Sequence, residues 1–279
     1  MSILYDAPGP RTRRRHAIGG VVGGLVVAAF LALIVWKLNK EGQFSDAYWA
    51  PFQNSGVWQN TLLPGLRYTV QAAALAILLA VAFGMLLCAA RLSDHLAVRV
   101  PGVIIIEFFR ACPLLLMILF FYLAFGKQLG TLWPLVLGLM VYNGSVLAET
   151  FRAGINAVPR GEVEAGYSVG LVKSQVTRTI LLPQAIRAML PAIISQCVVA
   201  LKDTSLGFII SYEELVRRGK GIYESYYDII PTGLVLAAMF ITMNYTLSRV
   251  ATYIEARLRR RGQHTVRPTV GESTIEETG

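Results

Sequence analysis

Hydrophobic residues of this chain gather into six long windows that are separated by short polar segments. Each window is at least 20 residues long and carries few charges, which is what an α-helix needs to cross a hydrocarbon core. The windows cover about 17 to 38, 64 to 90, 101 to 126, 132 to 151, 188 to 210 and 229 to 252. Lipid offers backbone groups no partners, so each window predicts a helix. The pattern predicts an all-α polytopic membrane protein with about six transmembrane helices.

The charged residues give this pattern an orientation. Hydrophobic residues make up 54% of the 279 residues and charged residues 15%, with a net charge of +9. Lysine and arginine near the spans are enriched on the cytoplasmic side. Here they are concentrated before the first window, after the last window, and in the loops near 91–99 and 152–187. We therefore expect a multi-pass plasma membrane protein with both termini in the cytoplasm, whose positive charge attracts anionic membrane lipid.

The chain lacks the residues that several kinds of catalytic and binding site need. Cys88, Cys112 and Cys197 stand singly in apolar runs, without C-x-x-C spacing. The sequence has no His/Cys cluster with metal-ligand spacing and no G-x-x-x-x-G-K-[ST] loop. No basic patch is interleaved with aromatic residues, as nucleic-acid binding would favour. The sequence therefore predicts neither an enzyme nor a metal site, and no cofactor on this chain.

The last large cytoplasmic loop, residues 152–187, contains the polar stretch EAGYSVGLVKSQVTRTILLP from residue 164 to 183. Pro159 precedes a first short helix that Gly170 is placed to end. A second amphipathic helix follows, and we expect Pro183 to end it. Such a helix pair rests its apolar side on the membrane interface or its own bundle, or in a groove of a soluble partner. The physical pattern alone leaves both open.

A fixed spacing in this loop resembles the E-A-A-x3-G-x9-I-x-L-P signature of ATP-binding-cassette importer permeases. The matching residues are Glu164, Ala165, Gly166, Gly170, Ile180, Leu182 and Pro183. The resemblance implies the type I importer permease fold and a coupling helix seated in a cleft of an ATPase subunit. It also implies ATPase-coupling roles for Glu164, Ala165, Gly166, Gly170 and Pro183. Gly166 departs from the usual Ala, which should loosen the helix by up to about 1 kcal/mol while keeping the residue small.

Other segments resemble one branch of that family, the permeases for polar amino acids. They are LLPGLRYTVQ near Pro64, EFFRACPLLL around Arg110, VYNGSVLAETFRAGINAVPRGEVEAG from Val141 and LKDTSLGFIISYEEL from Leu201. RRGKGIYESYYDIIPTGLV resembles the corresponding segment of actinobacterial glutamate permeases. The cations Arg67, Arg110, Lys202, Arg217, Arg218 and Lys220 favour entry of an acidic solute. Together these features favour glutamate or aspartate as the substrate. Glutamine or a basic amino acid is the alternative, in which Arg217, Arg218 and Lys220 would instead dock the substrate-binding protein.

The resemblance divides the chain and implies its partners. We expect a basic cytoplasmic tail at 1–16, an extra transmembrane anchor and outer loop at 17–59, a five-helix permease core at 60–255 with the coupling loop 152–187, and a cytoplasmic tail at 256–279. A dimer of ATPase subunits would bind ATP and Mg, which fits the missing nucleotide loop. A second permease chain, identical or related, and an extracellular substrate-binding protein would complete the importer.

Polar side chains inside the windows are candidates for a substrate pathway, because a charge at the bilayer centre costs roughly 2.5 to 3.5 kcal/mol. The candidates are Arg110, Asn143, Glu149, Lys202, Asp203, Thr204 and Ser205. Structural roles are open for several of them. Glu107 and Arg110 are spaced to pair on one helix face, as are Glu149 and Arg152. Asn143 could form a hydrogen bond between helices.

Two function classes fit these observations. One is the transmembrane subunit of an ATP-driven importer, in which the ATPase biases a two-state bundle through the coupling loop. The other is an ion-coupled secondary transporter working alone, with Glu107, Glu149 and Asp203 carrying the proton or cation. Breaks at Pro113 and Gly207 would free backbone groups to line a polar path in either case. A scaffold that only anchors a soluble partner is a third class.

Overall fold

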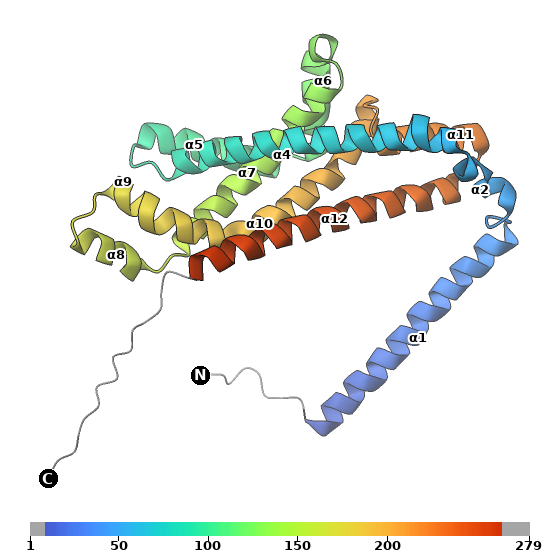
Figure 1. Ribbon diagram of the computed structural model, residues 1–279, viewed down its shortest axis with the longest axis horizontal. Helices are drawn as coiled ribbons and strands as arrows, with labels where there is room; N and C mark the ends of the chain where they lie inside the picture. The colour runs from blue at the N-terminus through green and yellow to red at the C-terminus, as the bar shows by residue number, and fades with distance from the viewer. Residues whose placement is uncertain (1–8, 264–279) are drawn as a thin grey trace.

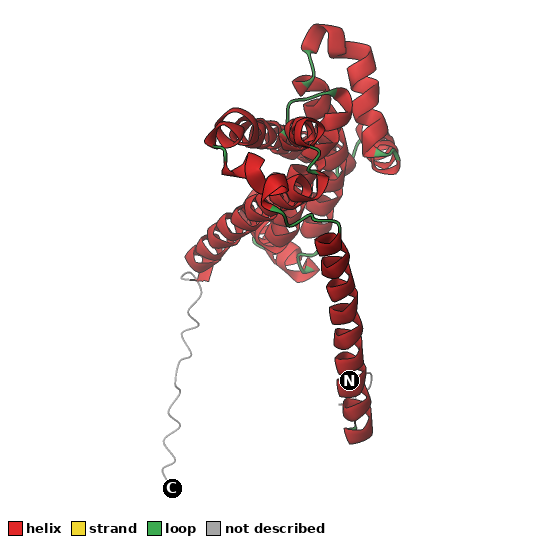
Figure 2. Ribbon diagram, turned by 90° about the vertical axis from the view of Figure 1, so that its right-hand side faces the viewer, coloured by secondary structure: helices red, strands yellow, loops and turns green. Residues whose placement is uncertain are grey.

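The computed structural model describes residues 9–263, which form helices and no strands (Figures 1 and 2). The elements are α1 Pro10–Lys40, α2 Asp46–Gln53, α3 Ser55–Val57, the π-helix η1 Trp58–Leu62, α4 Leu63–Arg91, α5 Leu96–Ala111, α6 Leu114–Leu129, α7 Leu132–Asn156, α8 Arg160–Ser168, α9 Lys173–Val176, the π-helix η2 Thr177–Leu181, α10 Leu182–Asp203, the 3-10 helix η3 Thr204–Ile210, α11 Leu215–Tyr226 and α12 Ile229–Gln263. The start of the predicted basic tail and the acidic end GESTIEETG lie outside the described residues.

Five helical stretches of the described chain are long and apolar enough to cross a membrane. They are Arg11–Lys40, Ser55–Arg91, Leu132–Asn156, Lys173–Ile210 and Ile229–Arg257. These stretches match five of the six hydrophobic windows in the sequence. The sixth window corresponds to the bent pair of α5 and α6, which passes the same test only when the two helices are taken together. The prediction of a polytopic all-α membrane protein is confirmed.

The window from 101 to 126 does not form the single continuous helix that the sequence predicts. α5 and α6 meet at an angle of 103°, and α6 projects from the rest of the bundle (Figure 1). Cys112 between them has the extended conformation, with φ −79° and ψ 132°. Pro113 explains this extended conformation, because a proline ring disfavours the helical conformation in the preceding residue and supplies no N–H. The prediction of one straight span is wrong, whereas the expected break at Pro113 is present.

The expectation that Pro183 ends the second helix of the coupling loop is also wrong. The helix continues through the π-helix η2 into α10, where Pro183 occupies the first turn. Proline has no N–H to give to the carbonyl of residue i−4, and the changed hydrogen-bond pattern of a π-helix accommodates this missing donor. The π-helix interrupts the regular i→i−4 pattern just before the proline. The coupling loop is therefore joined to a membrane-crossing helix without a break.

Small residues let α4 and α7 cross at very close range. Ala72, Ala76 and Ala80 of α4 are buried along the contact. A Cβ atom on Gly84 would lie 2.8 Å from the carbonyl oxygen of Gly144, and one on Gly144 would lie 2.8 Å from Phe83 Cδ1. In a membrane such small-residue faces replace the hydrophobic effect as the source of helix association. The two helices form the centre of the described bundle.

The two ends of the bundle carry different elements. α8, α9 and the C-terminal end of α12 lie at one end, and α2 and α11 lie at the other (Figure 1). This arrangement agrees with a topology in which the coupling loop and the end of α12 share one side of the membrane. α1 stands away from the bundle in both views (Figures 1 and 2), and the apolar window of its span is 0% buried.

Candidate functional site

The first helix of the coupling loop, α8, ends in a Schellman motif centred on Gly170. The N–H of Gly170 donates to the carbonyl of Tyr167 at 2.9 Å, and the N–H of Leu171 donates to the carbonyl of Gly166 at 3.2 Å. Gly170 has φ +85°, a conformation that glycine adopts without a Cβ clash. The predicted role of Gly170 in ending the helix is confirmed.

Gly166, the departure from the E-A-A pattern, packs inside the loop. A Cβ atom there would lie 2.7 Å from Ile180 Cδ1 and 3.1 Å from Val176 Cγ2. Val176 is fully buried. The absence of a side chain thus lets α8 lie close to η2. The glycine costs helix propensity, as the sequence indicates, but it also allows the tight packing that holds the two halves of the loop together.

Apolar side chains are exposed at the tip of the coupling loop. Val169 is 76% exposed, Val172 59% and Tyr167 47%. Glu164 and Ala165 are exposed on α8 as well. Exposed apolar groups that gather beside polar ones are typical of surfaces that bind another protein. We call the surface formed by Tyr167, Val169 and Val172 the tip patch.

Two contacts tie the coupling loop to other parts of the chain. Lys173 forms an ion pair with Asp94, which lies in the turn between α4 and α5. The hydrogen bond from Lys173 and its positive charge lower the pKa of Asp94. Gln184 Nε2 donates to Glu162 Oε2 at 3.3 Å, which connects α10 with the start of α8. A displacement of the loop would therefore reach both α10 and the α4–α5 turn.

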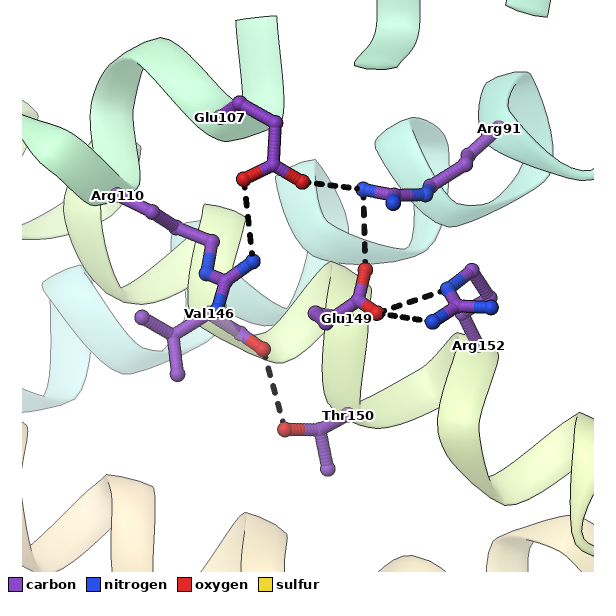
Figure 3. Close-up of polar contacts among 7 residues, drawn as sticks. All are labelled: Arg91, Glu107, Arg110, Val146, Glu149, Thr150 and Arg152. Carbon is purple, nitrogen blue, oxygen red and sulfur yellow. Dashed lines mark hydrogen bonds and ion pairs between the residues drawn. The ribbon is translucent and has the colours of Figure 1, made fainter.

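An ion-pair network joins α4, α5 and α7 (Figure 3). Arg91 Nη1 lies 3.0 Å from Glu107 Oε1 and 3.1 Å from Glu149 Oε2. Arg110 Nη1 lies 3.5 Å from Glu107 Oε2, and Glu149 also pairs with Arg152. The pairs Glu107–Arg110 and Glu149–Arg152, which the spacing favours, are both present. Arg91 joins the two pairs, but the sequence does not indicate it as a partner. It lies 16 residues before Glu107, at the end of a hydrophobic window where a charged residue is expected to be in a loop.

Removing Glu149 should destabilise the bundle. Its side chain is 22% exposed and that of Arg91 19%, so Glu149→Gln leaves Arg152 without its carboxylate and Arg91 with Glu107 alone. We expect a loss of about 1 to 3 kcal/mol, below the 3 to 5 kcal/mol typical of fully buried pairs. Thermal unfolding of the purified protein measures it.

Glu224→Gln is the matched control for this prediction, because the pair of Glu224 with Lys220 spans 3.4 Å and is more exposed. Such surface pairs contribute about 0 to 1 kcal/mol. Equal effects of the two substitutions would show that the network adds no stability beyond that of a surface pair.

The remaining pathway candidates lie apart from this network. Asn143 is buried on α7, and its Oδ1 accepts a hydrogen bond of 2.7 Å from Gln196 Nε2 on α10. Lys202 is exposed at the end of α10, and Thr204 is buried with its hydroxyl bonded to the Leu201 carbonyl. Within the described residues no ion pair or hydrogen bond joins the group Lys202, Asp203, Thr204 and Ser205 to Arg110 or Glu149. Their pathway role stays a prediction.

A buried carboxylate that sequence reasoning missed lies at the opposite end from the coupling loop. Glu214 is 0% exposed and caps α11, with its two oxygens accepting hydrogen bonds of 2.7 Å from the N–H groups of Val216 and Arg217. Burial raises the pKa of Glu214 to about 7, although the two N–H donors oppose the rise. The only signal in the sequence was the pair of adjacent glutamates in ISYEEL.

The raised pKa makes stability depend on pH in a defined direction. Between about pH 4.5 and 7 the folded chain holds a proton that the unfolded chain releases, so stability falls as pH rises through this window and is flat above it. We expect a gain of about 2 kcal/mol from Glu214 on going from pH 7.5 to 5.5. Thermal unfolding at both pH values measures it, with Glu214→Gln as the reference. An equal pH response in both proteins would contradict the assignment to Glu214.

Comparisons with known proteins agree with this arrangement. Residues 83–260 match the family of binding-protein-dependent transport system inner membrane components. The glutamate transport system permease protein GluD of Corynebacterium glutamicum is 40% identical over 229 residues, which cover 80% of this chain and 84% of GluD. The probable glutamine ABC transporter permease protein GlnP of Bacillus subtilis is 32% identical over 70% of this chain and 93% of its own.

A solved structure has the same fold over the same region. A chain of an amino acid ABC transporter crystallised with histidines superposes with a TM-score of 0.67 and 27% identity, over 72% of this chain and 95% of its own. The family match covers well over half of the chain and includes the network, the coupling loop and α10. The chain therefore belongs to the family of binding-protein-dependent transport system inner membrane components, the permease family that the coupling-loop spacing indicated.

Proposed function

We propose that this chain is the transmembrane permease of an ATP-driven importer for polar amino acids, with glutamate or aspartate as the substrate. The observation that carries the proposal is the tip patch. It lies on a loop that has the E-A-A-type spacing and that continues into a membrane-crossing helix. A groove on an ATPase subunit fits such a surface, because it would bury Tyr167, Val169 and Val172.

The partners follow from this assignment. A dimer of ATPase subunits would hold ATP and Mg and would contact the loop at Glu164, Ala165 and Gly170. Gly166 and Pro183 would act within the loop, through its packing and its join to α10. A second permease chain, identical or related, would complete the pathway. A substrate-binding protein would deliver the amino acid at the outer face.

The acidic substrate rests on similarity to GluD more than on charge. Three of the six cations that favour an acidic solute lie in ion pairs, namely Arg110 with Glu107, Arg218 with Glu213 and Lys220 with Glu224. Arg218 also donates to the Asn60 carbonyl and lies over the Tyr68 ring. Within the described residues Lys202 lies in no such pair, and it is exposed at the end of α10, where it could meet a carboxylate.

Uptake in cells tests the substrate. Deletion of this chain should remove the uptake of labelled glutamate, and Lys202→Ala should lower that uptake without lowering the abundance of the protein in the membrane. If deletion removes arginine or glutamine uptake but leaves glutamate and aspartate uptake intact, the acidic substrate is wrong and the importer assignment stands.

The orientation is part of the same proposal, with both termini and the coupling loop in the cytoplasm of a plasma membrane protein. Single cysteines at Ser45 and Ser225, at the end that holds α2 and α11, should react with an impermeant label in intact cells. A cysteine at Ser174 in α9 should react only after lysis. Labelling of Ser174 from outside would place the coupling loop on the wrong side for a cytoplasmic ATPase.

The competing assignment, an ion-coupled transporter working alone, has less support. Glu107 and Glu149 each lie in ion pairs with arginine. Two of its three candidate ion carriers are thus already engaged in structural contacts. It also gives no reason for an exposed apolar tip on a cytoplasmic loop.

A further inference from the structure

An amide pair lies where α7 and α10 pack together. Asn143 is 1% exposed, and its Nδ2 donates to the carbonyl of Leu139 at 2.9 Å. Gln196, half-buried on α10, donates from Nε2 to Asn143 Oδ1 at 2.7 Å. The sequence pointed to Asn143 but not to Gln196, whose only signal was a single amide in an apolar window.

The Leu139 carbonyl determines the orientation of both amides. A backbone carbonyl only accepts hydrogen bonds, so the NH2 group of Asn143 must face it and the Asn143 oxygen must face α10. Gln196 must then present its own NH2 group to that oxygen. Its carbonyl oxygen, Oε1, is held pointing away from Asn143. Within the described residues no donor reaches Gln196 Oε1, so a fixed acceptor is left open.

The exposed side of α10 carries polar as well as apolar side chains. Ser195 and Lys202 are exposed seven residues apart, which places them on nearly the same face, with Gln196 beside them. Polar and charged side chains inside a membrane rarely face lipid and almost always face the bundle interior or a water-filled cavity. This side of α10 therefore fits the wall of a polar path better than a lipid-facing surface.

We propose that Gln196 binds the solute, its Oε1 accepting a hydrogen bond from the α-ammonium group of the transported amino acid. Asn143 is then a positioning residue, which touches Gln196 and holds its amide in the accepting orientation. Lys202 lies about 9 Å further along α10, within reach of a carboxylate of the same solute through its long side chain. The inference rests on the proposed function and adds how the group common to all amino acids is recognised.

Equilibrium binding to the purified permease–ATPase complex, without the substrate-binding protein, tests this role. Labelled L-glutamate, L-glutamine and L-arginine are each compared with the analogue that lacks only the α-amino group. Gln196→Met removes the acceptor at similar size, and Gln196→Ala is a second variant should the first fail to fold. Ile186→Met, at an exposed position of α10 about 15 Å back toward the coupling loop, is the control. Monodisperse elution and thermal unfolding establish that each variant is folded.

The wild-type complex should bind its amino acid about tenfold or more tightly than the analogue, because a site that is built to hydrogen-bond a group rejects the molecule lacking it. Gln196→Met should remove most of this difference by weakening the amino acid alone, and Ile186→Met should keep it. Asn143→Leu should lower the same ratio by a smaller factor, which a purely structural role would not do.

Two results would overturn the inference. In the first, the Gln196 variants keep the ratio or weaken amino acid and analogue equally, which removes the role of Gln196 and leaves the proposed function intact. In the second, the wild-type complex binds none of the three amino acids, which removes the proposed substrate class together with the inference.

Discussion

Gly170→Arg should abolish transport and release the ATPase while leaving the permease folded in the membrane. Gly170 lies beside the tip patch, and no atom lies within 4 Å of the position that its Cβ would take. An arginine there would project from the loop into the groove of the partner. The left-handed conformation would cost about 1 to 2 kcal/mol locally, too little to unfold the bundle. Co-purification with the ATPase should fall by about tenfold or more.

Gly170→Asn separates the two consequences of this change. Asparagine tolerates the left-handed conformation and is small, so it should keep most of the ATPase association and most of the uptake. Normal transport by the arginine variant would exclude the coupling role of this surface. Equal losses in both variants would mean that backbone geometry, and not the added bulk, determines the effect.

Gly144→Leu should prevent the bundle from folding. The side chain would meet Phe83 and the carbonyl of Ala80, with a Cβ 2.8 Å and 3.1 Å from their nearest atoms. The second contact is backbone and cannot move aside without separating α4 from α7. Overpacking commonly costs about 1 to 3 kcal/mol, and we expect more than that at a backbone contact. The yield of monodisperse, detergent-purified protein measures the effect.

Gly233→Leu on α12 provides the control, because no atom lies within 4 Å of the corresponding Cβ position. It makes the same chemical change in another membrane-crossing helix and should keep the yield of the wild-type protein. A well-folded Gly144→Leu protein would mean that α4 and α7 do not cross as closely as described.

Much of the fold was predictable because a membrane imposes few solutions. Windows of about 20 apolar residues must be helices, and five of the six match helical stretches in the structure. The angle between α5 and α6 was not predictable. Pro113 indicates a break, but the hydropathy is high on both sides of it. The size of the bend depends on how α6 packs on α7. Pro183 failed as a stop signal because a π-helix before it changes the hydrogen-bonding pattern.

The candidate site was predictable only where contacts are local. Pairs three residues apart, such as Glu149 with Arg152, follow from helix geometry. Arg91 and Gln196 lie far along the chain from Glu149 and Asn143, so no spacing rule connects them before the helices are placed. Glu214 reads as an ordinary surface residue, since burial depends on how α11 packs. The E-A-A-type spacing points to the loop, and the structure adds that its apolar tip is exposed.

Uptake into proteoliposomes distinguishes an ATP-driven importer from an ion-coupled transporter. The permease is reconstituted with its ATPase and its substrate-binding protein, and the entry of a labelled polar amino acid is followed with ATP supplied on the ATPase side or with a proton or sodium gradient instead. We expect uptake that requires ATP and the ATPase and that a gradient alone does not drive. Gradient-driven uptake by the permease without the ATPase would contradict it.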